Sequence, residues 1–169
     1  MELEKQSKLD VLTGLFNKHA TEELIRAIVP DLDPKWDLCD LIMIDADDFK
    51  RINDTFGHAV GDRVLSQIGS ILRSHVRMMD VAGRVGGDEF MILMRNVASV
   101  DASARIAERI LAQVKDTFER DPDAPNLSLS AGIALYPQNG TDFDSLYSAA
   151  DHALYESKRH GKGIVRFSL

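Results

Sequence analysis

The sequence contains almost no cysteine and no long apolar run. Cys39 is the single cysteine among 169 residues, so an intramolecular disulfide and a cysteine-rich zinc site are both excluded. Apolar runs such as LIMI at 41–44 fall far below the length of a membrane span. The charged N-terminus lacks the apolar centre of a secretory signal. A cytoplasmic location is the simplest prediction.

Several catalytic signatures are also missing. There is no G-x-S-x-G motif, and the segment 161–163 lacks the upstream glycine and the hydroxyl of a P-loop. The five histidines have no spacing suited to zinc. A calcium-binding EF-hand that starts at Asp45 fits poorly, because Lys50 and Phe56 stand where that loop requires glycine and glutamate.

The composition is that of an ordinary globular domain. Hydrophobic residues make up 44% and charged residues 28% of the chain, and 169 residues suffice for one domain with a sizeable core. The formal net charge of −7 repels nucleic acid and anionic membranes at long range. We therefore expect no nucleic-acid partner.

Helical and extended patterns alternate along the chain. Apolar residues recur at helical spacing after Asn17, over 60–72, over 106–118 and from about Asp144. Strands are predicted at 38–46, 78–85, 90–94, 127–136 and 165–167. Periodicity alone does not exclude a helix at 38–46. The alternation favours an α/β or α+β sheet with helices packed on it.

The segment DADDFKRINDTFGHAVGD (45–62) places three acids within four positions, directly after a predicted buried strand. Hard divalent cations such as Mg²⁺ prefer carboxylate oxygens, usually one or two from the protein together with substrate phosphates. Asp45, Asp47 and Asp48 are therefore candidate metal ligands. In isolation, the pattern fits a solvated acidic strand end equally well.

The segment RVGGDEF (84–90) joins two predicted strands and indicates a hairpin. Gly86 and Gly87 permit positive φ and allow a phosphate or nucleotide to approach the backbone. Taken alone, an ordinary turn is the favoured interpretation. If the strand that carries Asp45 neighbours this hairpin, carboxylates of both segments would converge as they do in two-metal phosphoryl-transfer sites.

The basic segment KRHGK (158–162) follows the last predicted helix. Cations at a helix C-terminus complement the macrodipole, which is sufficient reason for their presence. The functional alternative is that they supply positive charge to a triphosphate. The segment alone leaves both interpretations open.

Together these segments resemble the GGDEF family of diguanylate cyclases. The resemblance runs over nearly the whole chain in five ordered blocks: DVLTGLFNKH (10–19), DADDFKRINDTFGHAVGD (45–62), RVGGDEF (84–90), GIALYPQNGTD (132–142) and ADHALYESKRHGKG (150–163). It implies a GGDEF catalytic domain over 10–169. Residues 1–9 are interpreted as a polar tail or the remnant of a helical stalk, with a sensory domain or stalk expected further upstream.

The resemblance implies an α+β fold similar to nucleotidyl cyclase and polymerase palm domains, with a central, mostly antiparallel sheet flanked by helices. It implies condensation of two GTP molecules into the second messenger cyclic di-GMP with release of two pyrophosphates. The implied cofactors are two Mg²⁺ ions per active site, with Mn²⁺ as an alternative. Since one GTP per chain cannot close the ring, a homodimer with facing subunits is implied.

Roles within the family carry over to individual positions. The implied metal ligands are Asp45, the carbonyl of Ala46, and Asp88, and the implied catalytic groups are Asp88, Glu89 and Lys50. The implied substrate-binding residues are Asn53, His58, Asp62, Gly86, Gly87, Lys158 and Lys162. Asp62 would accept hydrogen bonds from guanine N1–H and the 2-amino group and thereby reject adenine, which lacks that donor pair.

A second implied site lies upstream of the hairpin. Arg77 and Asp80 match the family's RxxD site, at which cyclic di-GMP inhibits its own synthesis, and Arg105 or Arg109 would contribute from the following helix. A guanidinium binds phosphate or guanine edges bidentately, and a carboxylate accepts from guanine. A surface ion pair at a helix–strand junction is the alternative interpretation.

The sequence departs from the family pattern at two places. Lys18 stands where the family usually has arginine, which keeps the charge but loses the guanidinium fork. Lys162 and Gly163 replace the common Arg-Asn pair. Neither departure touches the implied metal ligands.

Two other functions stay open. The chain would also fit a non-catalytic receptor that binds cyclic di-GMP at Arg77 and Asp80, or GTP at a degenerate site. The intact acids Asp45, Asp88 and Glu89 disfavour that interpretation. A polymerase-like palm acting on nucleic acid is disfavoured by the net charge of −7.

Overall fold

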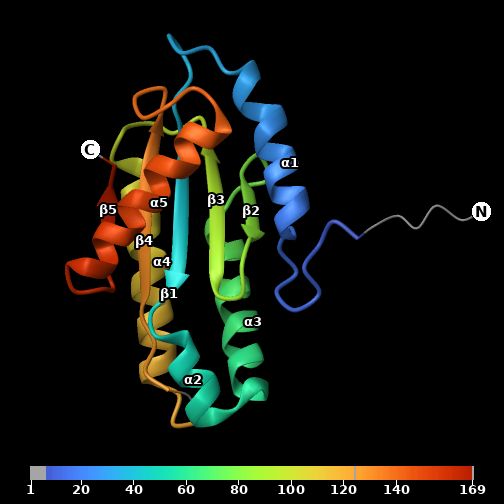
Figure 1. Cartoon of the computed structure of the whole chain (residues 1–169), viewed down its shortest axis with the longest axis vertical. Helices are drawn as coiled ribbons and strands as arrows, with labels where there is room; N and C mark the ends of the chain where they lie inside the picture. The colour runs from blue at the N-terminus through green and yellow to red at the C-terminus, as the bar shows by residue number, and fades with distance from the viewer. Residues whose placement is uncertain (1–6, 124, 169) are drawn as a thin grey trace, which may run out of the picture.

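Five strands form a single sheet in the computed structural model, which describes residues 7–123 and 125–168 (Figure 1). The strands are β1 (Cys39–Ala46), β2 (Val81–Arg84), β3 (Glu89–Arg95), β4 (Leu129–Tyr136) and β5 (Val165–Phe167), in the order β2-β3-β1-β4-β5. The β2–β3, β3–β1 and β1–β4 pairs are antiparallel, and β4–β5 is parallel. The predicted α+β class with a mostly antiparallel sheet is confirmed.

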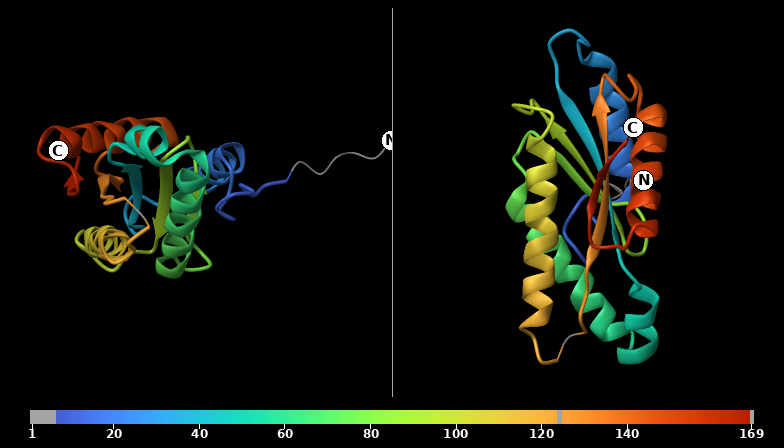
Figure 2. Two further views of the ribbon diagram at one scale, coloured as in Figure 1. Left: turned by 90° about the horizontal axis from the view of Figure 1, so that it is seen from below. Right: turned by 90° about the vertical axis from the view of Figure 1, so that its left-hand side faces the viewer.

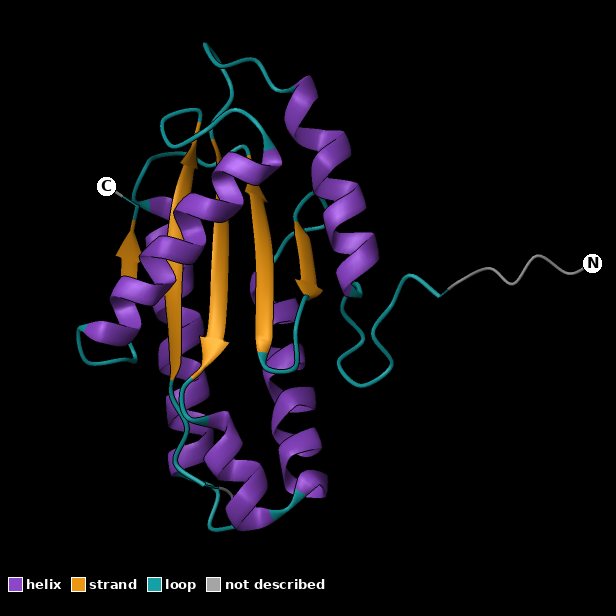
Figure 3. Ribbon diagram, in the orientation of Figure 1, coloured by secondary structure: helices purple, strands orange, loops and turns teal. Residues whose placement is uncertain are grey.

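Helices flank both faces of this sheet (Figure 2). They are α1 (Lys18–Ile28), α2 (Phe49–Phe56), α3 (His58–His75), α4 (Ala102–Glu119) and α5 (Phe143–Arg159), with a short 3₁₀ helix at Val29–Asp31. Helices α1 and α5 cover one face and α3 and α4 the other, while α2 lies beyond the end of β1 (Figure 1). Figure 3 shows that the loops gather at the ends of the strands, where ligand sites of sheet proteins are commonly built.

The middle of strand β1 is apolar on both faces because it lies between two cores. Leu41 and Met43 pack in the core under α1 and α5, whereas Ile42 and Ile44 pack in the core under α3 and α4. This alternation follows from the two-residue period of a strand. Gly132 of β4 lies where an added Cβ would overlap the backbone of α5, so the glycine permits the close approach of the helix that carries Lys158.

Capping contacts confirm two of the predicted helix starts. The Asn17 side chain accepts from Ala20 N at 2.9 Å at the start of α1, and Asp142 accepts from Ser145 N at 2.7 Å at the start of α5. Side-chain acceptors of this type satisfy the free N–H groups of the first turn. Pro30 follows the end of α1, and Gly161 adopts a φ of +112° just after α5.

The strand predicted at 78–85 is wrong in its first part. Met78–Asp80 form a turn and β2 begins at Val81. The Asp80 carboxylate accepts from the backbone N–H of Arg77 at 2.8 Å, and this local bond competes with extended pairing. Helix α2 was not predicted as a separate element, because eight residues offer too short a pattern.

The prediction of a tail or stalk at residues 1–9 falls partly outside the described residues, which begin at residue 7. Asn17 N donates to the Lys8 carbonyl at 2.9 Å, and Leu9 forms an isolated bridge with Phe16. Within residues 7–123 and 125–168, none of the helices combines the length and apolar character that crossing a membrane requires.

Candidate active site at the end of strand β1

The end of β1 meets the β2–β3 hairpin, as the convergence of carboxylates requires. Asp45 pairs with Glu89 of β3 on one side and with Ser130 of β4 on the other. The Ala46 N–H donates to the Asp88 carbonyl at 3.2 Å, which fixes the hairpin tip against the strand end. Three acids from two segments that are distant in sequence therefore share one edge of the sheet.

Asp45 has a buried carboxylate oxygen with unused hydrogen-bonding capacity. Its Oδ1 is buried and has no hydrogen-bond partner among the described residues. Burial raises the pKa of Asp45 to about 7, Lys158 opposes this shift, and the nearby Asp88 and Glu89 add to it. A buried carboxylate oxygen without a donor, surrounded by further negative charge, fits a bound cation.

The donor set suits a metal ion that also binds substrate. Among residues 7–123 and 125–168, no three His, Cys, Asp or Glu side chains form a ready-made metal cluster. Mg²⁺ is commonly held by one or two carboxylates and completes its octahedron with water and substrate phosphates. Asp45, Asp88 and the carbonyl of Ala46 would supply the protein ligands here.

Asp47 differs from Asp45 in its hydrogen bonding, although both belong to the same run of acidic residues. Its side chain is 4% exposed, and both of its oxygens are used. Oδ1 accepts from Ser130 Oγ at 2.7 Å and from Lys158 Nζ at 2.8 Å, while Oδ2 accepts from Ser128 Oγ at 2.6 Å and from Gly163 N at 3.1 Å. With four donors in place, Asp47 acts as an anchor for its neighbours and has no free oxygen for a metal.

Two predicted lysines reach this edge from α5 and the turn that follows it. Lys158 Nζ lies 3.4 Å from Asp45 Oδ2 and 3.3 Å from the Ala46 carbonyl oxygen. Burial lowers the pKa of Lys158, but the hydrogen bond and charge of Asp47 and Asp45 outweigh burial and raise it. Lys162 Nζ binds Asp48 at 2.9 Å, and this contact lowers the pKa of Asp48.

The backbone at this ion pair is unusual. Asp48 has a φ of 54° and Lys162 a φ of 61°, both in the left-handed region. Residues other than glycine adopt this region rarely, and such conformations concentrate at functional sites. The chain thus turns sharply at both residues and places their side chains beside the candidate metal-binding edge.

A cavity of about 380 Å³ lies between this edge and helices α2 and α3. It is lined by Phe49, Lys50, Asn53, His58, Asp62, Leu65, Arg84, Gly87 and Asp88. The structure therefore brings the predicted residues Lys50, Asn53, His58 and Asp62 together with the hairpin. The volume falls within the range of small-molecule pockets.

Gly61 shapes the cavity through Asn53. An added Cβ at Gly61 would overlap Oδ1 of Asn53, so the glycine leaves room for the amide at the base of α2. Gly61 immediately precedes Asp62 on α3. The α2–α3 pair thus presents an amide and a carboxylate side by side to the cavity.

Arg84 is a site residue that the sequence analysis did not select. Its Nε and one terminal nitrogen donate to the Gly87 carbonyl at 3.1 and 2.8 Å, and the other terminal nitrogen pairs with Asp10 at 3.2 Å. The arginine thereby holds the glycine turn against the start of the domain. Its position directly before the turn, within RVGGDEF, was the available signal.

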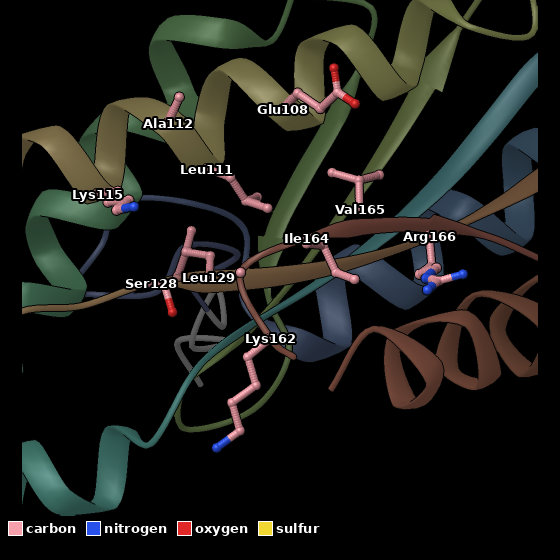
Figure 4. Close-up of a pocket in the computed structure, with 11 residues that line it drawn as sticks. Glu108, Leu111, Ala112, Lys115, Ser128, Leu129, Lys162, Ile164, Val165 and Arg166 are labelled. Atoms are coloured by element: carbon pink, nitrogen blue, oxygen red, sulfur yellow. The ribbon is translucent and has the colours of Figure 1, made fainter. Parts of the chain in front are cut away.

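A second cavity, of about 830 Å³, lies between α4 and the segment that leads into β5 (Figure 4). Its walls include Leu111, Leu129, Ile164 and Val165, with Glu108, Lys115 and Arg166 at its edges. Lys162 also borders it, but this side chain extends away from α4 (Figure 4), and its ammonium binds Asp48. None of the carboxylates at the end of β1 lines this second cavity.

The predicted inhibitory residues lie together at the start of β2. The Asp80 side chain has no exposed surface and accepts from the backbone N–H of Arg95 at 3.0 Å. The Arg77 guanidinium, half exposed, pairs with Asp80 at 3.2 Å and donates to the Arg95 carbonyl. Arg105 and Arg109, the further candidates, lie on α4.

A carboxylate with an unpartnered buried oxygen at a strand end, beside a pocket with amide, carboxylate and lysine side chains, is typical of metal-assisted nucleotide-binding sites. The family described as "Diguanylate cyclase, GGDEF domain" matches residues 7–163, so the chain belongs to this family. Diguanylate cyclases use a divalent metal ion, and the oxygens at the end of β1 are suited to one.

Relatives and solved structures agree with this assignment. Diguanylate cyclase A of Treponema denticola is 35% identical over 99% of this chain. The GGDEF domain of TpbB from Pseudomonas aeruginosa superposes with a TM-score of 0.87 at 36% identity, covering 95% of this chain and 94% of that one. The GGDEF domain of DgcB from Caulobacter crescentus, solved in complex with c-di-GMP, gives a TM-score of 0.87 at 27% identity over 97% of both chains. The chain spans about half the length of the curated relatives it matches, 46% in the case of diguanylate cyclase A.

Proposed function

We propose that this chain condenses two GTP molecules into cyclic di-GMP and releases two pyrophosphates, using a divalent metal. The observation that carries the proposal is that the candidate metal ligands lie next to the candidate base-binding cavity. Asp45, with a buried and unpartnered oxygen, adjoins Asp88, and Asp88 lines the cavity that holds Asn53 and Asp62. A metal–phosphate group and a base can therefore be bound by adjoining parts of one site.

Asn53 and Asp62 are the residues proposed to read guanine. The carboxylate of Asp62 would accept from N1–H and the 2-amino group, and the amide of Asn53 would complete the contact. Adenine offers no such donor pair, so its binding would leave buried acceptors unsatisfied. His58 lies at the start of α3 in the same cavity and would border the nucleotide.

The phosphates would extend from the cavity towards the end of β1. Lys50 lines the cavity, and Lys158 and Lys162 form ion pairs with Asp45 and Asp48 near the end of β1, so positive side chains lie near the proposed path. When bound, two Mg²⁺ ions would neutralise charge on the phosphate oxygens and acidify the attacking 3′-hydroxyl. Asp88 and Glu89 are the carboxylates proposed to accept that proton, and Gly86 and Gly87 would leave the backbone of the turn open to the phosphates.

Ring closure requires a second subunit. The reaction joins two GTP molecules, and the attacking hydroxyl would come from the GTP bound at the same cavity of a facing chain. We therefore propose a two-fold symmetric homodimer in which the two hairpins face each other. Additional segments of a longer protein would bring the chains together by raising their effective concentration.

Product inhibition is proposed at Arg77. Its guanidinium is half exposed and can bind phosphate or a guanine edge of cyclic di-GMP. Asp80 is buried and engaged with two backbone N–H groups, so its role in the described conformation is to orient Arg77. This differs from the expectation that both side chains contact the product directly.

The test is a product analysis. Purified protein is incubated with GTP and Mg²⁺ at a concentration that supports dimerisation, and the nucleotides are separated by chromatography. We expect cyclic di-GMP from the wild-type protein and none from Asp88→Ala, with ATP yielding no product. Consumption of GTP without cyclic di-GMP, or no reaction at any protein concentration, would refute the proposal.

A further inference from the structure

Lys158 contacts the same groups that are proposed to hold a metal. Its ammonium lies 3.4 Å from Asp45 Oδ2 and 3.3 Å from the carbonyl oxygen of Ala46. The same ammonium lies 2.8 Å from Asp47 Oδ1, its shortest ion-pair contact. A divalent ion on Asp45 and Ala46 would therefore meet a positive charge already bound to both.

We propose that Lys158 is a tethered counter-cation that competes with the divalent ion for Asp45 and the Ala46 carbonyl. This inference rests on the proposed function for the identity of the metal ligands. Metal binding displaces the ammonium from Asp45, and Asp47 retains it at the edge, where it turns towards the phosphates of the arriving nucleotide. Lys158 thus couples occupation of the metal site to binding of the triphosphate.

The local charge explains why such a counter-cation is useful. Asp45, Asp88 and Glu89 lie close enough for the last two to act on the first, and the Lys158 and Asp45 side chains are only 23% and 21% exposed. Carboxylates gathered in a poorly solvated place repel one another unless a cation lies among them. The ammonium supplies that charge from the protein itself.

Asp47 limits how far the ammonium can move. Three of its four donors are the Ser128 and Ser130 hydroxyls and the Gly163 N–H, which belong to other segments and fix the carboxylate in place. The displaced ammonium therefore keeps its shortest contact while it gives up the two longer ones. Asp47 is a positioning residue, since it acts through Lys158.

The chain offers a matched control in Lys162. Its ammonium binds Asp48 at 2.9 and 3.0 Å, and the hydrogen bonds and ion pairs of the described residues include none from it to Asp45 or Ala46. Removing either lysine changes the net charge by the same amount. A difference between the two variants therefore reports the contact with Asp45 and not the general electrostatic field.

The test measures binding of Mn²⁺ alone, without nucleotide, from the electron paramagnetic resonance signal of the free ion. We expect Lys158→Met to bind Mn²⁺ at least about fivefold more tightly than the wild type, and Lys162→Met to stay within about twofold. Asp45→Asn should lose this binding, which locates the ion. Circular dichroism checks the fold, and Lys158→Gln replaces the methionine variant if that variant unfolds.

A second titration uses a non-hydrolysable GTP analogue with Mn²⁺ and tests the other half of the coupling. We expect Lys158→Met to bind the analogue about tenfold more weakly than the wild type, because the triphosphate loses a cation. Equal or weaker binding of Mn²⁺ alone by Lys158→Met would overturn the inference. The Mn²⁺ titration does not depend on turnover, so a protein that binds the ion but makes no cyclic di-GMP would refute the proposed function alone.

Discussion

Strand β1 carries an aspartate near each of its ends, and the two have different roles. Asp40 is 2% exposed and faces the core under α4, whereas Asp45 faces α5 at the opposite end of the strand. Burial raises the pKa of Asp40 to about 6 and that of Asp45 to about 7. By burial and pKa alone, both would be candidates for a functional site.

Their neighbours separate them. Asp40 is affected by burial and by Ser103, whose hydroxyl makes no hydrogen bond of regular geometry. Asp45 lies among Lys158, Asp88 and Glu89, beside the nucleotide-sized cavity. The comparison teaches that a perturbed carboxylate marks a site when charged groups from other segments converge on it.

The largest effect is expected from replacing each of the two aspartates, which tests this comparison directly. Asp45→Asn keeps the shape of the side chain but removes the charge that a metal requires, so synthesis of cyclic di-GMP should fall at least about 100-fold. Asp40→Asn should keep the rate within about twofold, since it lies away from every proposed substrate contact. Initial rates measured with both folded variants check this. A similar loss of rate in both variants would show that burial of the carboxylate, and not its position in the strand, determines its effect on activity.

A smaller effect is expected at the proposed guanine-binding residues, which lie in the cavity next to Asp45. Gly61→Ala would push the amide of Asn53 from its place, and we expect the KM for GTP to rise about tenfold with little change in kcat. In an Asn53→Ala background the overlapping atom is gone, so adding Gly61→Ala should cost little more. Steady-state kinetics of the four proteins measure the coupling. Equal effects of Gly61→Ala in both backgrounds would contradict the proposed contact.

Substitution of Asp40 should change the stability of the protein and not its activity. Its folded pKa of about 6 exceeds the ordinary aspartate pKa of 3.8, so the protonated form favours folding below pH 3.8 and this contribution is lost as pH rises through 6. The free energy of unfolding of Asp40→Asn, relative to the wild type, should therefore increase by about 2 kcal/mol between pH 4.5 and pH 7.5. Urea unfolding at both pH values measures it, and a pH-independent difference would count against the assignment.

The smallest effect on turnover is expected at Arg77. Arg77→Ala should weaken inhibition by added cyclic di-GMP about tenfold, while the initial rate before product accumulates stays within about twofold. Rates measured at increasing product concentration check this. Asp80→Ala is a poorer probe, because it removes a buried acceptor of two backbone N–H groups and would destabilise the turn. An unchanged inhibition constant in Arg77→Ala would remove Arg77 from the inhibitory site.

Much of the fold could be predicted from local pattern. Asn17 and the region near Asp144 marked helix starts that the capping contacts confirm, and the extended runs marked the strands. The turn at Met78–Asp80 could not be predicted, because the hydrogen bonds from backbone N–H groups to the Asp80 carboxylate override the extended propensity of its neighbours.

The residues of the candidate site could be predicted from the sequence, but their separate roles could not. Asp45 and Asp47 look equivalent in sequence, and Asp47 differs because Ser128 and Ser130, more than 80 positions away, donate to it. Such contacts depend on the pairing of β1 with β4, which no local pattern specifies. The contact of Gly61 with Asn53 and that of Arg84 with Asp10 likewise depend on packing between separate segments, whereas the Gly87 partner of Arg84 lies only three residues away.

The most direct test of the claim that the Asp45 end is the metal–nucleotide site is a crystal structure with Mn²⁺ and a non-hydrolysable GTP analogue. We expect anomalous scattering from manganese at direct coordination distance from Asp45, with the guanine between Asn53 and Asp62. Manganese bound away from Asp45, or a guanine outside the cavity between α2 and the hairpin, would contradict that claim.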